Sequence, residues 1–164
     1  MTILIAHRGL LDGPNLELEN TPKTLELART NGYDVELDLW FVDGRWFLGH
    51  DNPSYPIEFE WLQFINRTNY LDQHHALIHT KNIEALYELT RRHWDGHMFF
   101  HDKDAVVLTS SKFLWTYPGQ TLTTKSVCLM PEWDDTINRI NELDVYAICT
   151  DYVKLVETAI RTKN

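Results

Sequence analysis

The stretch YDVELDLWFVDGRWFLGHD, residues 33–51, constrains the fold of this chain most, because it places two acids inside an apolar run. Glu36 and Asp38 alternate with Val35 and Leu37. Side chains two apart in a strand share a face, so both carboxylates point to the same side. Two like charges on a strand built for burial repel each other and lose hydration. We therefore expect a cation between them, and a divalent metal ion is the simplest candidate.

The same stretch reverses direction at an Asp-Gly pair, positions 43 and 44, which predicts a two-residue hairpin. Residues at equal distances before and after the turn then face each other, so Glu36 lies opposite Asp51 and Leu37 lies opposite His50. In perfect register Asp51 shares the carboxylate face and His50 lies on the other face. One bulge residue or an early end to the strand reverses that arrangement. The pattern leaves both alternatives open.

Size and composition predict one globular domain, residues 1–164, with its own core: the chain has 164 residues and is 43% hydrophobic. Its 15 Lys and Arg against 24 Asp and Glu give a formal charge of −9, which disfavours nucleic acid or anionic membranes as partners. The N-terminal apolar run is too short for a signal peptide or a membrane span, so we expect a cytoplasmic protein. There, Cys128 and Cys149 are expected to be thiols.

Strand-like and helix-like segments alternate along the chain, which predicts an α/β fold with a parallel sheet. Pro131 is expected to open a helix that turns Trp133 inward. We expect strands at residues 2–6, from 33 through the hairpin, and at 76–78, 98–100, 105–108, 113–115, 127–130 and 145–149, and helices at 22–30, 57–65, 82–93 and 153–160.

As many as eight strands with several helices missing predict a truncated TIM-barrel-like (β/α)8 fold, since a complete barrel takes about 200 residues or more. The position of polar residues favours this fold. They fall in or after the C-terminal halves of the expected strands, where barrels carry their chemistry. These residues are His7, Glu36, Asp38, His79, Lys81, His101 and Asp151.

Several short motifs follow one another in the first half of the chain. They are His7-Arg8-Gly9, Glu19-Asn20-Thr21, Glu36-Leu37-Asp38, Gly49-His50-Asp51 and His79-Thr80-Lys81, with Thr150-Asp151-Tyr152 near the end. In this order and spacing the chain resembles the glycerophosphodiester phosphodiesterase family, within the phosphatidylinositol phospholipase C-like superfamily. The resemblance covers the first half of the chain and is weaker after residue 82.

The resemblance implies a TIM barrel that cleaves glycerophosphodiesters with the help of a divalent cation. The residues at the positions of His7 and His50 would act as general acid and general base. Those at the positions of Arg8 and Lys81 would hold the phosphate. The expected partner is therefore a small phosphodiester. The resemblance also suggests that the substrate's glycerol hydroxyl attacks first and forms a cyclic phosphate, and the sequence does not separate a hydrolase from a lyase that stops there.

The metal would be bound by Glu36 and Asp38, and here the chain departs from the family. His79 stands where the family has a glutamate, so an imidazole replaces a third carboxylate. Magnesium and calcium prefer oxygen ligands, whereas manganese also accepts imidazole. The metal is therefore left open among Mg, Ca and Mn.

Three further residues are candidates for lining the site: Glu19, Asp51 and Trp115. An alternative of another class is also open, in which a truncated and inactive barrel binds a phosphorylated ligand or a protein partner. The two hypotheses differ in whether His79 supports a working metal site. The oligomeric state and the head group of the substrate are not indicated by the sequence.

Overall fold

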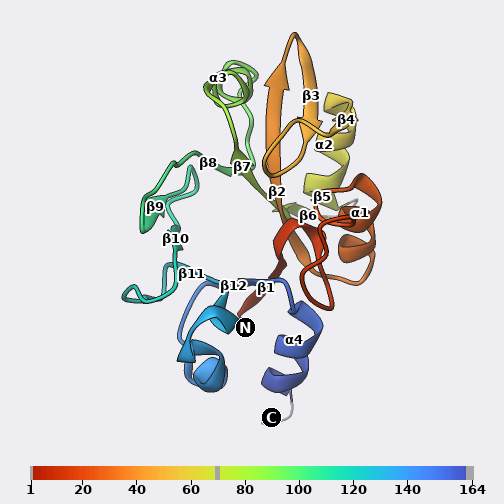
Figure 1. The fold of residues 1–164 in the computed structure, drawn as a ribbon. Coiled ribbons are helices and arrows are strands. Elements are labelled where there is room, and N and C mark those ends of the chain that lie inside the picture. The colour runs from red at the N-terminus through yellow and green to blue at the C-terminus, as the bar shows by residue number, and fades with distance from the viewer. Residues whose placement is uncertain (1, 69–70, 162–164) are drawn as a thin grey trace.

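A strongly curved sheet organises the part of the chain that the computed structural model describes, residues 2–68 and 71–161 (Figure 1). Neighbouring strands in the main part of this sheet run parallel. In spatial order they are β10 (Leu114–Thr116), β11 (Ser126–Leu129), β12 (Ala147–Thr150), β1 (Ile3–Ala6), β2 (Asp34–Val42), β7 (Ala76–Thr80) and β8 (His97–Phe99).

Antiparallel strands extend this sheet at two places. β2 is long enough for its first half to pair with β1 and β7 while its far end forms a hairpin with β3 (Arg45–Leu48), and β4 (Tyr55–Ile57) pairs with β3. β9 (Val106–Leu108) runs antiparallel to β10. A separate pair, β5 (Arg67–Thr68) and β6 (Leu71–His74), was not predicted from the sequence.

Helices cover the outer side of the sheet beside β1, β2, β7 and β12 (Figure 1). They are α1 (Pro22–Thr30), α2 (Phe59–Asn66), α3 (Ile83–Arg91) and α4 (Val153–Arg161). The helix expected at residues 22–30 is confirmed as α1: Pro22 is its first residue, and the Thr21 hydroxyl accepts from the Thr24 N–H. No helix within the described residues is long and apolar enough to cross a bilayer.

The helix expected from Pro131 is wrong in detail. This segment forms two 3-10 helices, η2 (Pro131–Trp133) and η3 (Asp135–Glu142). Asp134 is extended between them, with φ −145°, and its carboxylate accepts from the Thr136 N–H, so it starts a new turn where a continuous helix would have run on. Trp133 is 64% exposed and does not face inward.

The curvature of the sheet encloses an apolar interior. Ile5, Leu77, Phe99 and Trp115, from four different strands, belong to one buried cluster. The Phe99 and Trp115 rings have centroids 4.7 Å apart, which brings β8 against β10 across the interior. Two further clusters lie between the outer face of the sheet and its helices.

The α/β class is confirmed, and the parallel sheet curls into a partial barrel without closing by strand pairing. Within the described residues, β8 has a strand partner on the β7 side alone. On its other side, Met98 accepts a backbone hydrogen bond from Ser110 at 2.9 Å and donates to the Ser110 hydroxyl at 3.0 Å. The reason is local: residues 100–113 form no helix, and their strand β9 runs antiparallel to β10.

Candidate functional site

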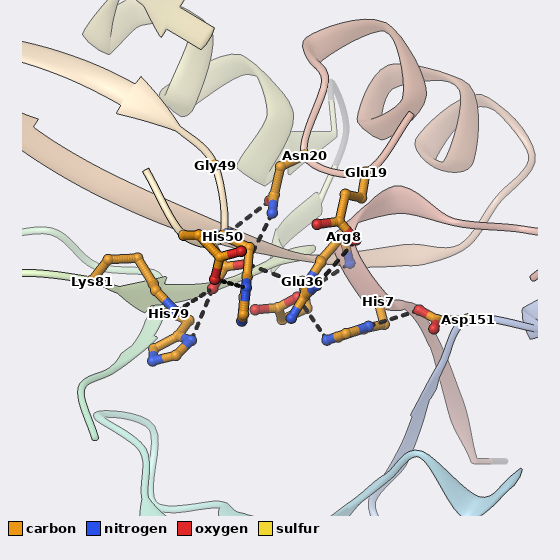
Figure 2. Close-up of polar contacts among 12 residues, drawn as sticks. His7, Arg8, Glu19, Asn20, Glu36, Gly49, His50, His79, Lys81 and Asp151 are labelled. Atoms are coloured by element: carbon orange, nitrogen blue, oxygen red, sulfur yellow. Dashed lines mark hydrogen bonds and ion pairs between the residues drawn. The ribbon is translucent and has the colours of Figure 1, made fainter. Parts of the chain in front are cut away.

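Glu36 and Asp38 lie side by side on β2 and are almost completely buried, with 2% and 1% of their surface exposed. β2 is flanked by β1 and β7, and its register places Asp38 next to His79. The shared face expected from the alternation is therefore present, because Glu36, Asp38 and His79 bring polar atoms within 4.8 Å of one another. Figure 2 shows Glu36 and His79 among the surrounding side chains.

Asp38 is surrounded by donors. Asn20 clamps it, because the Asn20 amide donates to Oδ2 at 2.8 Å while the Asp38 N–H donates to Asn20 Oδ1 at 2.9 Å. His79 Nδ1 lies 3.0 Å and Lys81 Nζ 3.3 Å from Oδ1. Burial by itself would raise the pKa of Asp38, but the hydrogen bond from His79 and the charges of Lys81 and Arg8 outweigh it and hold the pKa well below its usual range.

Glu36 has weaker support than Asp38. It accepts a hydrogen bond from the Arg8 N–H at 3.1 Å, and His7 Nε2 is 3.8 Å from the same oxygen. Burial, followed by the charge of Asp38, raises the pKa of Glu36. A carboxyl group in this position ionises readily only when a further positive charge is near.

His7 connects the acid pair to a third carboxylate. It follows β1, and its Nδ1 lies 2.7 Å from Asp151, which follows β12. The contact assigns the Nδ1 proton to the Asp151 side and leaves Nε2 facing Glu36. Burial lowers the pKa of His7, but the hydrogen bond to Asp151 and the charge of Glu36 outweigh it and raise the pKa above the ordinary value.

The hairpin has the predicted register, with Leu39 opposite Leu48 and Val42 opposite Arg45. Of the two alternatives left open, the structure shows the early strand end, because β3 stops at Leu48. Gly49 then takes φ 145°, donates to the Asp38 carbonyl at 3.2 Å and accepts from the Trp40 indole at 2.6 Å.

This turn at Gly49 directs His50 into the cluster (Figure 2). His50 Nδ1 is 2.7 Å from Asp51, whose side chain is 83% exposed. Asp51 therefore lies at the rim, where it contacts the imidazole and not the acid pair. Burial and the charge of Arg8 lower the pKa of His50, so the two histidines are shifted in opposite directions.

Arg8 occupies the centre of the cluster. Its backbone is left-handed, with φ 51°, and its guanidinium binds Glu19 at 3.0 Å. Arg8 Nε lies 3.3 Å from Asp38, which is an ion-pair contact, but it is not aligned for a hydrogen bond. This buried N–H therefore has no hydrogen-bond acceptor within the described residues. Glu19 therefore belongs to the site through its contact with Arg8.

The structure places Trp115 away from the open side of the site. Its side chain is 2% exposed and packs on Phe99, whose ring in turn stacks on His79 with centroids 4.8 Å apart. Trp115 therefore packs in the interior behind His79 and does not line the open side of the site.

Two residues have larger roles in the site than the sequence indicated. Thr21 caps α1, and the neighbouring Asn20 clamps Asp38. Asp151 orients His7. The signal for Asn20 was its position beside Glu19, and the contact of Asp151 depends on a separation of 144 residues that no local pattern encodes.

The donor set fits a divalent cation. Glu36, Asp38 and His79 each offer a ligand atom, and these atoms lie within 4.8 Å of one another. Atoms bound to one ion at about 2.1–2.4 Å are separated by no more than about 4–5 Å, so small side-chain movements suffice. The mixed oxygen and nitrogen set is one that manganese accepts.

Comparisons with protein-family models, with curated proteins and with solved structures find no match to this chain.

Proposed function

We propose that this chain is a metal-dependent phosphodiester hydrolase that acts on glycerophosphodiesters, and that it is a short, divergent and truncated TIM-barrel-like relative of the glycerophosphodiester phosphodiesterases. One observation carries the proposal. Two imidazoles, His7 and His50, each contact an aspartate through Nδ1 and lie with two cationic side chains around a buried Glu-Asp pair.

The arrangement of the strands supports the same proposal. His7 follows β1, the acid pair lies on β2, and His79 and Lys81 lie at the end of β7. These strands are parallel neighbours in a curved sheet, so their C-terminal ends meet at one edge. Barrel enzymes carry their chemistry at this edge, and the motifs that resemble the family fall there.

His50 and His7 are suited to opposite proton transfers. We assign His50 as the general base, which takes a proton from the attacking hydroxyl group, and His7 as the general acid, which gives a proton to the leaving oxygen. Asp51 and Asp151 hold the proton on Nδ1 of each ring, so Nε2 is the reacting atom in both. The attacking group is the substrate's own glycerol hydroxyl, and a cyclic phosphate then forms before hydrolysis.

Charge on the phosphate is neutralised by the remaining residues. A divalent ion held by Glu36, Asp38 and His79 would polarise the phosphoryl oxygens when bound. Arg8 has an unused Nε–H donor, and guanidinium groups are well suited to phosphate oxygens. Lys81 adds a second positive charge beside Asp38.

An activity panel tests the proposal. Wild-type protein is assayed with bis(glycerol) phosphate and glycerophosphocholine in the presence of Mg²⁺, Ca²⁺ or Mn²⁺, and with a chelator. We expect turnover with at least one ion and none with the chelator. Glu36→Gln and His50→Asn should each lose at least about 100-fold in kcat/KM. The exposed His93→Asn, at the end of α3, is the matched control and should keep wild-type activity.

Equal turnover by wild type and both site variants would reject the assignment. Circular dichroism and thermal unfolding of each variant confirm that the fold is kept, so that a loss of activity is chemical.

A second candidate, a barrel that binds a phosphorylated ligand without cleaving it, is favoured by one observation. Asp38 already contacts Arg8, Lys81 and His79, so it is neutralised by side chains alone. Saturable binding of glycerol 3-phosphate together with no turnover of any diester, with any of the ions, would support this candidate over the hydrolase.

A further inference from the structure

A fourth imidazole, His101, lies beside His79 and is not used by the chemistry above. It follows β8, and its ring stacks on His79 with centroids 4.6 Å apart and planes 15° apart. The hydroxyl of Tyr117, which follows β10, lies 2.9 Å from His101 Nε2. Residues from three strands, β7, β8 and β10, thus form one wall next to the metal-ligand candidates.

The other ring nitrogen of His101 is left without a partner. Its Nδ1 is buried and makes no hydrogen bond within the described residues. A buried polar atom without a partner is costly, and such atoms in a site are commonly satisfied by a ligand. In the contact between Tyr117 and His101 we assign the phenolic hydroxyl as the donor and Nε2 as the acceptor. The proton of the neutral imidazole ring then lies on Nδ1. His101 then offers a fixed N–H donor.

The stacking geometry argues against a metal-binding role for His101. An imidazole binds a metal through a lone pair in the plane of the ring. The nearly parallel His79 and His101 rings aim their lone pairs in separate, parallel planes, so both cannot bind the same ion without a rotation. The geometry therefore favours a hydrogen-bonding role for His101 over a metal-binding role.

We propose that His101, oriented by Tyr117, is a specificity-determining residue that donates a hydrogen bond from Nδ1 to a hydroxyl oxygen in the alcohol part of the substrate. The inference rests on the proposed function for the phosphodiester itself, and it adds the residue that selects phosphodiesters whose alcohol part carries hydroxyl groups over diesters of simple alkyl alcohols.

The test is a binding measurement that needs no turnover. His50→Asn protein with Mn²⁺ is titrated calorimetrically with bis(glycerol) phosphate and with dimethyl phosphate, which carries the same charge but no hydroxyl group. Adding His101→Phe keeps an aromatic ring on His79 and removes the donor. This substitution should weaken the binding of bis(glycerol) phosphate by about five- to tenfold, which is the effect of one hydrogen bond. The affinity for dimethyl phosphate should stay within about twofold of the parent value.

Two further variants separate a hydrogen bond from a packing effect. His101→Asn keeps a donor near the position of Nδ1 and should recover part of the affinity. Tyr117→Phe removes the hydroxyl that fixes the His101 ring. It should weaken the binding of bis(glycerol) phosphate by less than His101→Phe does. Thermal unfolding of each variant shows whether its fold is kept.

Unchanged affinity for bis(glycerol) phosphate in His101→Phe would overturn the inference, as would an equal loss for both probes or no binding of either probe to the parent protein. Failure of the proposed function is distinguishable from these results. If the wild-type protein hydrolyses no diester but His101→Phe still loses affinity for bis(glycerol) phosphate alone, the recognition by His101 stands.

Discussion

Two imidazoles in the candidate site have the same kind of contact but different surroundings. His7 and Asp151 are both buried, whereas His50 is paired with the exposed Asp51. Burial and the charge of Arg8 lower the pKa of His50, whereas for His7 the effect of burial is outweighed by the hydrogen bond to Asp151 and the charge of Glu36, which raise its pKa. Between the two values His7 is protonated and His50 is neutral, which is the combination that the proposed acid-base chemistry needs.

The first prediction is a bell-shaped pH profile of kcat/KM. Activity rises with pH as His50 loses its proton, below the ordinary histidine value of about 6.5, and falls as His7 loses its proton above that value. Asp151→Asn removes the carboxylate charge and weakens the hydrogen bond that raises the pKa of His7, so the alkaline limb should move to lower pH.

Asp51→Asn is the matched control for this shift. Because the Asp51 side chain is 83% exposed, its charge is screened by water and the profile should move much less. A flat profile between pH 5 and 9, or an acid limb that moves in Asp151→Asn while the alkaline limb stays, would contradict the assignment of roles.

A second prediction for a single residue concerns the hydrogen bonds by which Asn20 supports the acid pair. Asn20→Ala leaves the buried Asp38 without two hydrogen bonds and places alanine at φ 56°, where asparagine is better tolerated. We expect the free energy of unfolding in urea to fall by about 2–4 kcal/mol. Asn15→Ala, at an exposed loop position, should lose less than about 0.5 kcal/mol. Equal stability of the two variants would refute the clamp.

At the scale of elements, the hairpin shows what local sequence can and cannot determine. Its register was predictable because an Asp-Gly turn fixes which residues face each other. The end of β3 was not, because it depends on Gly49, whose bonds go to the Asp38 carbonyl and the Trp40 indole. The face on which His50 lies therefore required the tertiary structure.

Gly49→Ala tests this element. A Cβ at Gly49 would lie 2.1 Å from the Asn52 carbonyl oxygen, and the φ of 145° disfavours any other residue. The turn must shift, so His50 moves and kcat/KM should fall by at least about tenfold. Gly44→Asn, at a turn with open space and φ 77°, should stay near wild type in the same assay. Wild-type kinetics in Gly49→Ala would show that the turn does not position His50.

For the whole molecule, the sequence predicted the elements better than the contacts between them. Many elements have a local signal, such as Pro22 after a capping Thr21, or Asn82 at the start of α3, although β4 and the β5–β6 pair were not predicted. The strands β8 to β11 lie where they were expected, but the contacts that hold this part are long-range, such as Phe99 with Trp115. The α/β class was therefore predictable, and the way the sheet ends was not.

The candidate site followed the same division. Residues on one strand or one turn were grouped correctly, because spacing defines their shared face. Contacts that join distant segments, such as His7 with Asp151 or His79 with His101, could not be read from the chain. These contacts are the ones that assign a tautomer or an orientation to each imidazole.

The central claim is that the buried acid pair holds a divalent cation, and a metal titration followed by calorimetry and thermal unfolding tests it most directly. The account predicts that Mn²⁺ binds wild-type protein saturably at one ion per chain and raises its melting temperature, and that Glu36→Gln and His79→Phe lose most of this affinity. Absence of saturable binding of Mn²⁺, Mg²⁺ and Ca²⁺ to wild-type protein, or equal binding by Glu36→Gln, would contradict it.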